Sequence, residues 1–107
     1  MLKERVGVYV NDSQRARHLA ERFTEAFGGC TILLGNGLWL SSNDEIMFET
    51  VYYVFSYAIK LDRQTVVNLA RVISEKLNDQ EAIAMQINDA LLIESPSELP
   101  QVIEKIL

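Results

Sequence analysis

The chain has 107 residues, of which 49% are apolar and 23% are charged, and its net charge is −5. This length is typical of a single domain, which we place over residues 1–107, and the apolar share excludes an intrinsically disordered chain. Ten basic residues against 15 acidic ones argue against nucleic acid as a partner, and residues 23–59 contain no Lys or Arg at all.

The single cysteine and the shortness of the apolar stretches indicate the cellular compartment in which the chain is expected. Cys30 is the only cysteine, so an intrachain disulfide and a multi-cysteine zinc site are excluded. No apolar stretch approaches the roughly 18 residues of a membrane span. The charged residues Lys3, Glu4 and Arg5 are unlike the start of a signal peptide. We therefore predict a cytoplasmic protein that does not associate with membranes.

The first third of the chain predicts a strand followed by a helix. Residues 5–10 alternate between valines and other residues, which is the period-two pattern of a strand. Polar residues 11–13 can accept hydrogen bonds from the first amides of a helix, and apolar residues then recur at spacings of three and four. Gly28 and Gly29 should end this helix, because glycine accepts the left-handed conformation common at helix ends.

A long hairpin is predicted next. Residues 30–34 and 38–40 are β-prone, and the glycine-rich interruption at residues 35–37 predicts a bulge or bend in the strand. After the polar turn of residues 41–44, a strand over residues 46–57 is apolar on both of its faces. One face should contact helices and the other a second surface.

The remaining elements complete an α+β domain. Asp62 can cap a second helix that Asn78 ends, and residues 82–87 and 91–93 read as two short strands joined by a turn. This order predicts a ferredoxin-like βαββαβ antiparallel sheet with two helices on one face, plus a short terminal strand. A C-terminal helix capped by Ser97 carries an apolar stripe that must dock on its own sheet or on a partner.

No residue stands out as catalytic. His18 is the only histidine, among several arginines on a helix, and is expected to be a surface residue without catalytic duty. Cys30 has no evident base nearby and is expected to be a buried, inert thiol. We therefore predict no catalytic residue, no metal site and no cofactor.

Short motifs nevertheless resemble a known group of proteins. The run Phe27-Gly28-Gly29-Cys30-Thr31, then Gly37-Leu38-Trp39, then Glu49, then Gln80-Glu81-Ala82 resembles a family of small uncharacterised bacterial proteins over residues 22–94. The family often has a basic residue where this chain has Leu40. The resemblance implies the ferredoxin-like order, brings no activity with it, and nominates Trp39, Glu49 and Glu81 as positions to test.

Two classes of function remain open. The first is a self-associating interaction or regulatory module without catalytic activity, forming a homodimer or another homo-oligomer, because two helices cannot cover both apolar faces. The second is a small-molecule-binding protein or a cofactor-free enzyme, with an apolar pocket at the hairpin lined by Trp39, Glu49 and Tyr53. Trp39, between Leu38 and Leu40, is expected to be a core anchor rather than an exposed ligand platform. Glu49 is expected in solvent at a sheet edge rather than partly buried with a partner.

Overall fold

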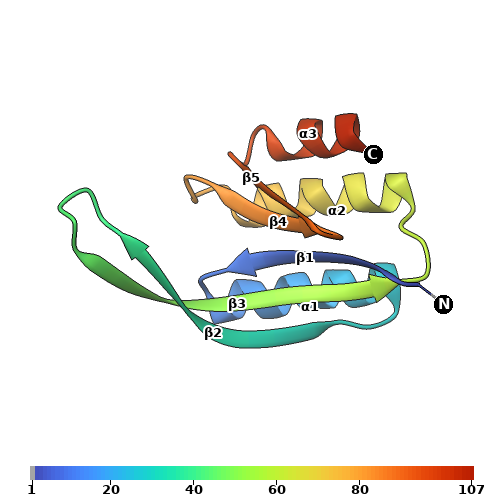
Figure 1. Ribbon diagram of the computed structural model, residues 1–107. Helices are drawn as coiled ribbons and strands as arrows, with labels where there is room; N and C mark the ends of the chain where they lie inside the picture. The colour runs from blue at the N-terminus through green and yellow to red at the C-terminus, as the bar shows by residue number, and fades with distance from the viewer. Residues whose placement is uncertain (1) are drawn as a thin grey trace.

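The computed structural model describes residues 2–107, an α+β fold of five strands and three helices (Figure 1). The elements follow in the predicted order: β1 (Glu4–Val10), α1 (Ser13–Phe27), β2 (Thr31–Leu40), β3 (Ile46–Ala58), α2 (Arg63–Lys76), β4 (Ile83–Ile87), β5 (Ala90–Glu94) and α3 (Leu99–Ile106). The strands form one sheet in the order β2-β3-β1-β4-β5, and every neighbouring pair is antiparallel.

The ends of α1 follow from the predicted signals. The Asp12 side chain accepts a hydrogen bond from the Arg15 amide at 2.8 Å, which satisfies one of the free amides of the first turn. Gly28 ends the helix with φ at 85°, a left-handed conformation in which other residues are strained. Leu19 and Phe23 lie on the face of α1 turned toward the sheet and are fully buried.

The second helix begins as predicted but ends earlier. Asp62 accepts a hydrogen bond from the Thr65 amide at 3.0 Å, so it is the cap. The prediction that Asn78 ends the helix is wrong, because Leu77 occupies the capping position. The Leu77 amide still donates to the Ile73 carbonyl at 2.9 Å, and its side chain is fully buried. Asn78 is not among the residues with positive φ, so it does not adopt the left-handed conformation expected of it.

The hydrophobic core lies between the helices and one face of the sheet. Alternate residues of the strands point toward α1 and α2, and these positions are buried: Val6, Val8, Val10, Val54, Ile83, Met85 and Ile87. In Figure 1 the helices lie on the side of the sheet away from the viewer. The opposite face of the sheet has no covering element within residues 2–107.

The predicted bulge in β2 does not form. The pairing of β2 with β3 is continuous, with Gly35 opposite Val51 and Gly37 opposite Glu49, so no extra residue is inserted. Gly37 has a different role, since a methyl group at this position would lie 2.9 Å from Cγ2 of Val51. The glycine relieves crowding between neighbouring strands rather than interrupting their pairing.

The β2-β3 hairpin extends well beyond the rest of the sheet. β1 ends at Val10, opposite Tyr52, so residues 35–51, here called the arm, have no third strand beside them. Thirteen strand residues span about 44 Å at about 3.4 Å per residue, whereas the 15 residues of α1 span only about 22 Å. Figure 1 shows the arm projecting past α1 and α2, and the molecule is 44 Å long but 26 Å wide.

The C-terminal helix docks on its own chain. Leu99 and Ile103 of α3 are fully buried, and α3 lies against α2 on the side away from α1 (Figure 1). The Arg63 side chain, at the start of α2, donates to the Glu104 carbonyl at 2.7 Å. The docking partner is therefore a helix of the same chain, and not the sheet.

The predicted cap of α3 is wrong. Glu98 occupies the capping position in place of Ser97 and makes no side-chain hydrogen bond to the helix. The amides of Glu98 and Leu99 donate instead to the Ser95 carbonyl, at 3.1 and 3.0 Å. A backbone acceptor thus satisfies the first turn, and Pro100 within that turn needs no acceptor because it has no amide hydrogen.

Candidate functional site: an open apolar sheet face

The face of the sheet turned away from the helices is predominantly apolar. Because strand residues alternate between faces, the neighbours of buried Val6 and Val54, such as Gly7 and Phe55, point away from the helices. We call this surface the open face. Its strand residues are Arg5, Gly7, Tyr9, Thr31, Leu33, Gly35, Gly37, Trp39, Met47, Glu49, Val51, Tyr53, Phe55, Tyr57, Ala84, Gln86, Leu91 and Ile93.

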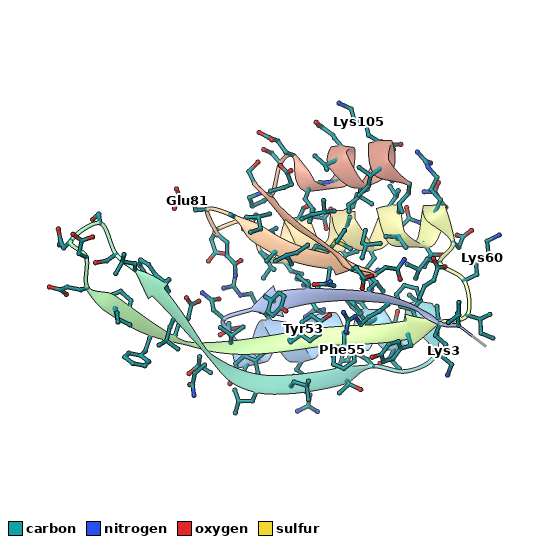
Figure 2. The ribbon with its side chains drawn as sticks, in the orientation of Figure 1. Lys3, Tyr53, Phe55, Lys60, Glu81 and Lys105 are labelled. Carbon is teal, nitrogen blue, oxygen red and sulfur yellow. The ribbon has the colours of Figure 1, made fainter. Side chains whose placement is uncertain are left out.

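An aromatic row runs through the middle of the open face. Tyr53 stacks on Tyr9 of the neighbouring strand with ring centres 4.6 Å apart, and on Phe55 with ring centres 4.8 Å apart. Tyr57 continues the row edge-on to Phe55 at 5.7 Å. Figure 2 shows Tyr53 and Phe55 on β3, at the centre of the face. Such mutually packed rings form a firm surface that loses little side-chain entropy when a partner binds.

The Tyr53 side chain is half-buried, so water is partly excluded from it. Burial raises the pKa of the Tyr53 phenol, although the nearby positive charge of Arg5 acts in the opposite direction. The phenol is therefore neutral at neutral pH. A neutral hydroxyl on an apolar face can enter an interface at a lower desolvation cost than a phenolate.

Large apolar side chains remain exposed across the rest of the open face. Leu33 is 54% exposed, Tyr57 52% and Ile93 64%. The accessible surface of the molecule is 6805 Å², whereas a folded monomer of 12.2 kDa should expose about 6,100 Å². The radius of gyration is 13.8 Å, against about 13 Å for a compact chain of this length. The chain thus exposes more surface than a closed monomer.

Two charged residues lie among the strand positions of the open face. Arg5 is near one end of the face, opposite Tyr57, and Glu49 is near the other, opposite Gly37. Both side chains are half-buried. Neither takes part in an ion pair or a side-chain hydrogen bond within residues 2–107.

The predicted site residues are only partly brought together. Glu49 lines a hollow of about 160 Å³ together with Tyr9 and Gln80. Tyr53 lies on the same face, but Glu81 is exposed in the loop before β4 (Figure 2). Glu49 is thus half-buried on a sheet face, and not in open solvent as predicted.

Trp39 does not belong to the core. The prediction of a core anchor is wrong, because its side chain is 51% exposed near the far end of the arm. α1 is about 22 Å long, about half the length of β3, and does not reach this part of the hairpin. Trp39 does not line the hollow beside Glu49 either, so the predicted grouping of Trp39, Glu49 and Tyr53 in one pocket does not form.

Sequence reasoning missed Arg5, Leu91 and Ile93 as members of the candidate site. The signal that could have found them is the period-two alternation: Val6 and Leu92 point toward the helices, so their neighbours must point away from them. What the alternation does not reveal is that β5 and β1 belong to the same continuous face as the hairpin.

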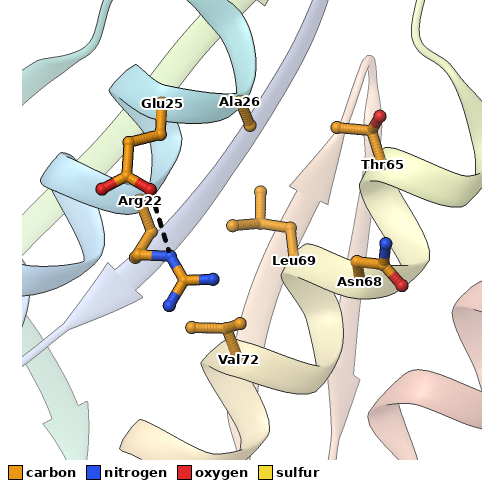
Figure 3. A pocket seen from close by; sticks show the side chains of 7 residues that line it. All are labelled: Arg22, Glu25, Ala26, Thr65, Asn68, Leu69 and Val72. Carbon is orange, nitrogen blue, oxygen red and sulfur yellow. Dashed lines mark ion pairs between the residues drawn. The ribbon is translucent and has the colours of Figure 1, made fainter.

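A second hollow lies between the outer surfaces of α1 and α2 (Figure 3). Its volume is about 250 Å³, and Arg22 lies over Leu69 and Val72. The Arg22 guanidinium is already paired with Glu25 at 3.8 Å. The hollow therefore offers neither a free charge nor a nucleophile for chemistry.

His18 and Cys30 are the single histidine and the single cysteine of the chain. His18 is exposed on α1, and no group of three or more potential metal ligands occurs within residues 2–107. Burial raises the pKa of the half-buried Cys30 thiol, against weaker lowering effects of hydrogen bonds from its surroundings. A thiol with a raised pKa is a poor nucleophile.

Comparison with protein-family models, curated proteins and solved structures gives no match. None of the helices within residues 2–107 has the length and apolar content needed to cross a bilayer. The open face is the most extensive uncovered apolar surface of the sheet within residues 2–107 that could contact a partner.

Proposed function

We propose that this chain is a self-associating interaction module whose open face binds the open face of a second copy. The observation that carries the proposal is the uncovered aromatic row of Tyr9, Tyr53, Phe55 and Tyr57, flanked by exposed Leu33 and Ile93. Monomers rarely leave an apolar surface of this extent in water, because its burial is the main source of association free energy.

The size of the open face suits a dimer. Five strands spaced about 4.8 Å apart and about seven residues long cover roughly 550 Å², and the arm adds about 200 Å². Each partner in a stable interface typically contributes about 800 Å². A second copy offers a surface of the same size and the same apolar character, as the twofold symmetry of a homodimer requires.

We also infer that β1 to β4 with α1 and α2 have the ferredoxin-like arrangement. The order β2-β3-β1-β4 supports this inference. β3 lies between β1 and β2, and β1 lies between β3 and β4, as in two interleaved split βαβ units. β5 and α3 are additions at one edge. The resemblance to the family of small bacterial proteins favours the same arrangement.

The alternative function, binding of a small apolar ligand at the hairpin, has less support. The hollow beside Glu49 has about 160 Å³, and sites for small molecules usually enclose about 300 Å³ or more. Trp39 lies outside this hollow. An extended apolar surface favours a macromolecular partner over a small ligand.

Sedimentation at micromolar concentration tests the proposal. The expected mass is twice the monomer value of 12.2 kDa. Leu33→Glu should shift the protein to monomer, because Leu33 lies on the open face, where a buried carboxylate without a partner is costly. The matched control is Leu34→Glu, since this exposed leucine is next in sequence and points to the other face. A wild-type protein that sediments only at 12.2 kDa would contradict the proposal.

A further inference from the structure

The two charges of the open face lie at opposite ends of the aromatic row. Arg5 is opposite Tyr57, and Glu49 lies eight residues before Tyr57 on β3. At about 3.4 Å per residue, the two positions are about 27 Å apart. No ion pair can form between them within one chain, and Tyr53 lies midway along β3.

Among the described residues, neither Arg5 nor Glu49 has a counter-charge, although both side chains would lose water if the open face were covered. Their side chains are half-buried, and neither forms an ion pair or a side-chain hydrogen bond within residues 2–107. If the face is covered by apolar surface, each charge loses more of its water. A buried charge without a counter-charge is strongly destabilising, so the covering surface must supply the opposite charge.

We propose that two copies stack face to face with β3 antiparallel to β3 of the partner, so that Arg5 of each copy pairs with Glu49 of the partner subunit. This inference rests on the proposed function and specifies its geometry. The twofold axis lies in the plane between the sheets, crosses the strands at right angles and passes close to Tyr53. The symmetry produces two identical ion pairs, one at each end of a central aromatic cluster.

The alternative orientation brings like charges together. A twofold axis parallel to the strands would place Arg5 over Arg5 of the partner subunit, and Glu49 over Glu49 of the partner subunit. Like charges that face each other across an interface repel and weaken the complex. The same pair of residues therefore favours one stacking direction and disfavours the other, which is how interfaces commonly fix their orientation.

The geometry of packed sheets suits this pairing. Stacked sheets lie about 10 Å apart with their strands within about 30° of each other. In the antiparallel stack, Arg5 and the partner's Glu49 are offset sideways by about one strand spacing of 4.8 Å, since they belong to the adjacent strands β1 and β3. A long arginine and a glutamate reaching toward each other can cover this separation.

The backbone at Arg5 is held in place before a partner binds. The Arg5 amide donates to Oδ1 of Asn88 at 2.9 Å, and the Asn88 amide donates to the Arg5 carbonyl at 2.8 Å. Asn88 makes this contact from the β4-β5 turn, where its φ is 52°. A fixed backbone reduces the entropy lost when the guanidinium pairs with a partner.

Charge reversal with subunit mixing tests the proposal. We expect Arg5→Glu alone and Glu49→Arg alone each to weaken dimerisation about tenfold or more, because each homodimer then contains two like-charge contacts. When the two variants are mixed, a heterodimer has opposite charges at both contacts and should form with nearly wild-type affinity. Isotope labelling of one variant and native mass spectrometry distinguish the heterodimer from either homodimer.

The controls separate orientation from association. Glu104→Arg and Lys105→Glu reverse charges on exposed positions of α3, in the helical layer, and Figure 2 shows Lys105 on this helix. Neither these variants nor their mixture should change dimerisation. If both open-face reversals leave the dimer unchanged, or if mixing restores nothing, the antiparallel stacking is wrong while the dimer stands. If the wild-type chain is monomeric, the proposed function itself has failed.

Discussion

The ring of Tyr53 lies directly over Gly7 on the neighbouring strand. A methyl group on Gly7 would fall 2.7 Å from both the hydroxyl oxygen and Cε1 of Tyr53, closer than such atoms approach in proteins. Gly7 is opposite Phe55 in the pairing, and Tyr53 is opposite Tyr9, so the ring reaches diagonally across the two strands. The position of the aromatic row therefore depends on a missing side chain.

Gly7→Ala should destabilise the fold by about 1–3 kcal/mol, because Tyr53 must leave its stacked position between Tyr9 and Phe55. In a Tyr53→Leu background the same change should cost much less, since the crowding ring is absent. Urea unfolding of the four proteins of this double-mutant cycle measures the coupling. An equal cost of Gly7→Ala in both backgrounds would show that the ring does not limit this position.

The protein should lose stability at alkaline pH through Tyr53. Burial raises the pKa of the Tyr53 phenol in the folded state. The resulting stabilisation is fully present below about pH 10, the pKa of an exposed tyrosine, and is lost as the pH rises through the higher folded value. Thermal midpoints between pH 8 and pH 12 should fall less for Tyr53→Phe than for the wild type. An equal fall in the two proteins would contradict this prediction.

Two isoleucines of α3 should differ sharply in their effect on stability. Ile103→Ala should cost about 2–5 kcal/mol, because the side chain is fully buried and its loss leaves a cavity. Ile106→Ala should cost less than about 1 kcal/mol, since this residue is 51% exposed. Neither change should lower the oligomer mass, because α3 lies in the helical layer. A drop in mass for Ile103→Ala, with the fold intact, would place α3 in the interface.

Cys30 should react slowly in the folded protein. Burial raises the pKa of its thiol, so the reactive thiolate is scarce at pH 8. Alkylation of the native protein should be about tenfold slower or more than alkylation in denaturant. Equal rates in the two conditions would mean that the strand start at Cys30 opens readily.

Capping residues next to the helices predicted where α1 and α2 begin, but not where α2 ends or where α3 begins. Asp62 caps its helix as predicted, and Asp12 caps α1 as one of the three polar residues proposed for that end, because a side-chain oxygen acts on amides only two or three residues away. The predicted roles of Asn78 and Ser97 failed, since Leu77 occupies the capping position of α2 and the Ser95 carbonyl accepts the first amide hydrogens at α3. Both actual caps lie one residue from the predicted ones, because neighbouring groups can satisfy the same free amides and carbonyls of a helix end.

The candidate site was predictable in character but not in extent. The apolar pattern of residues 46–57 indicated an uncovered face, and the exposed rings of the hairpin agree with it. The error at Trp39 came from assuming that helices cover the whole hairpin, although a 15-residue helix is only about half as long as a 13-residue strand. The contribution of Arg5 depends on β1 lying beside β3, a non-local pairing that no short motif specifies.

The boundary between β1 and β4 divides the sheet into two halves. Residues 4–58 form β1, α1 and the hairpin, whereas residues 63–106 form every other element. Within the sheet the halves meet at only three paired positions, from Val6 opposite Ile87 to Val8 opposite Met85. We expect partial unfolding to begin at this short seam, so that the amide hydrogens of β4 and β5 exchange with solvent together, before those of β3. A stacked second copy, by bridging the seam, would slow exchange in both halves.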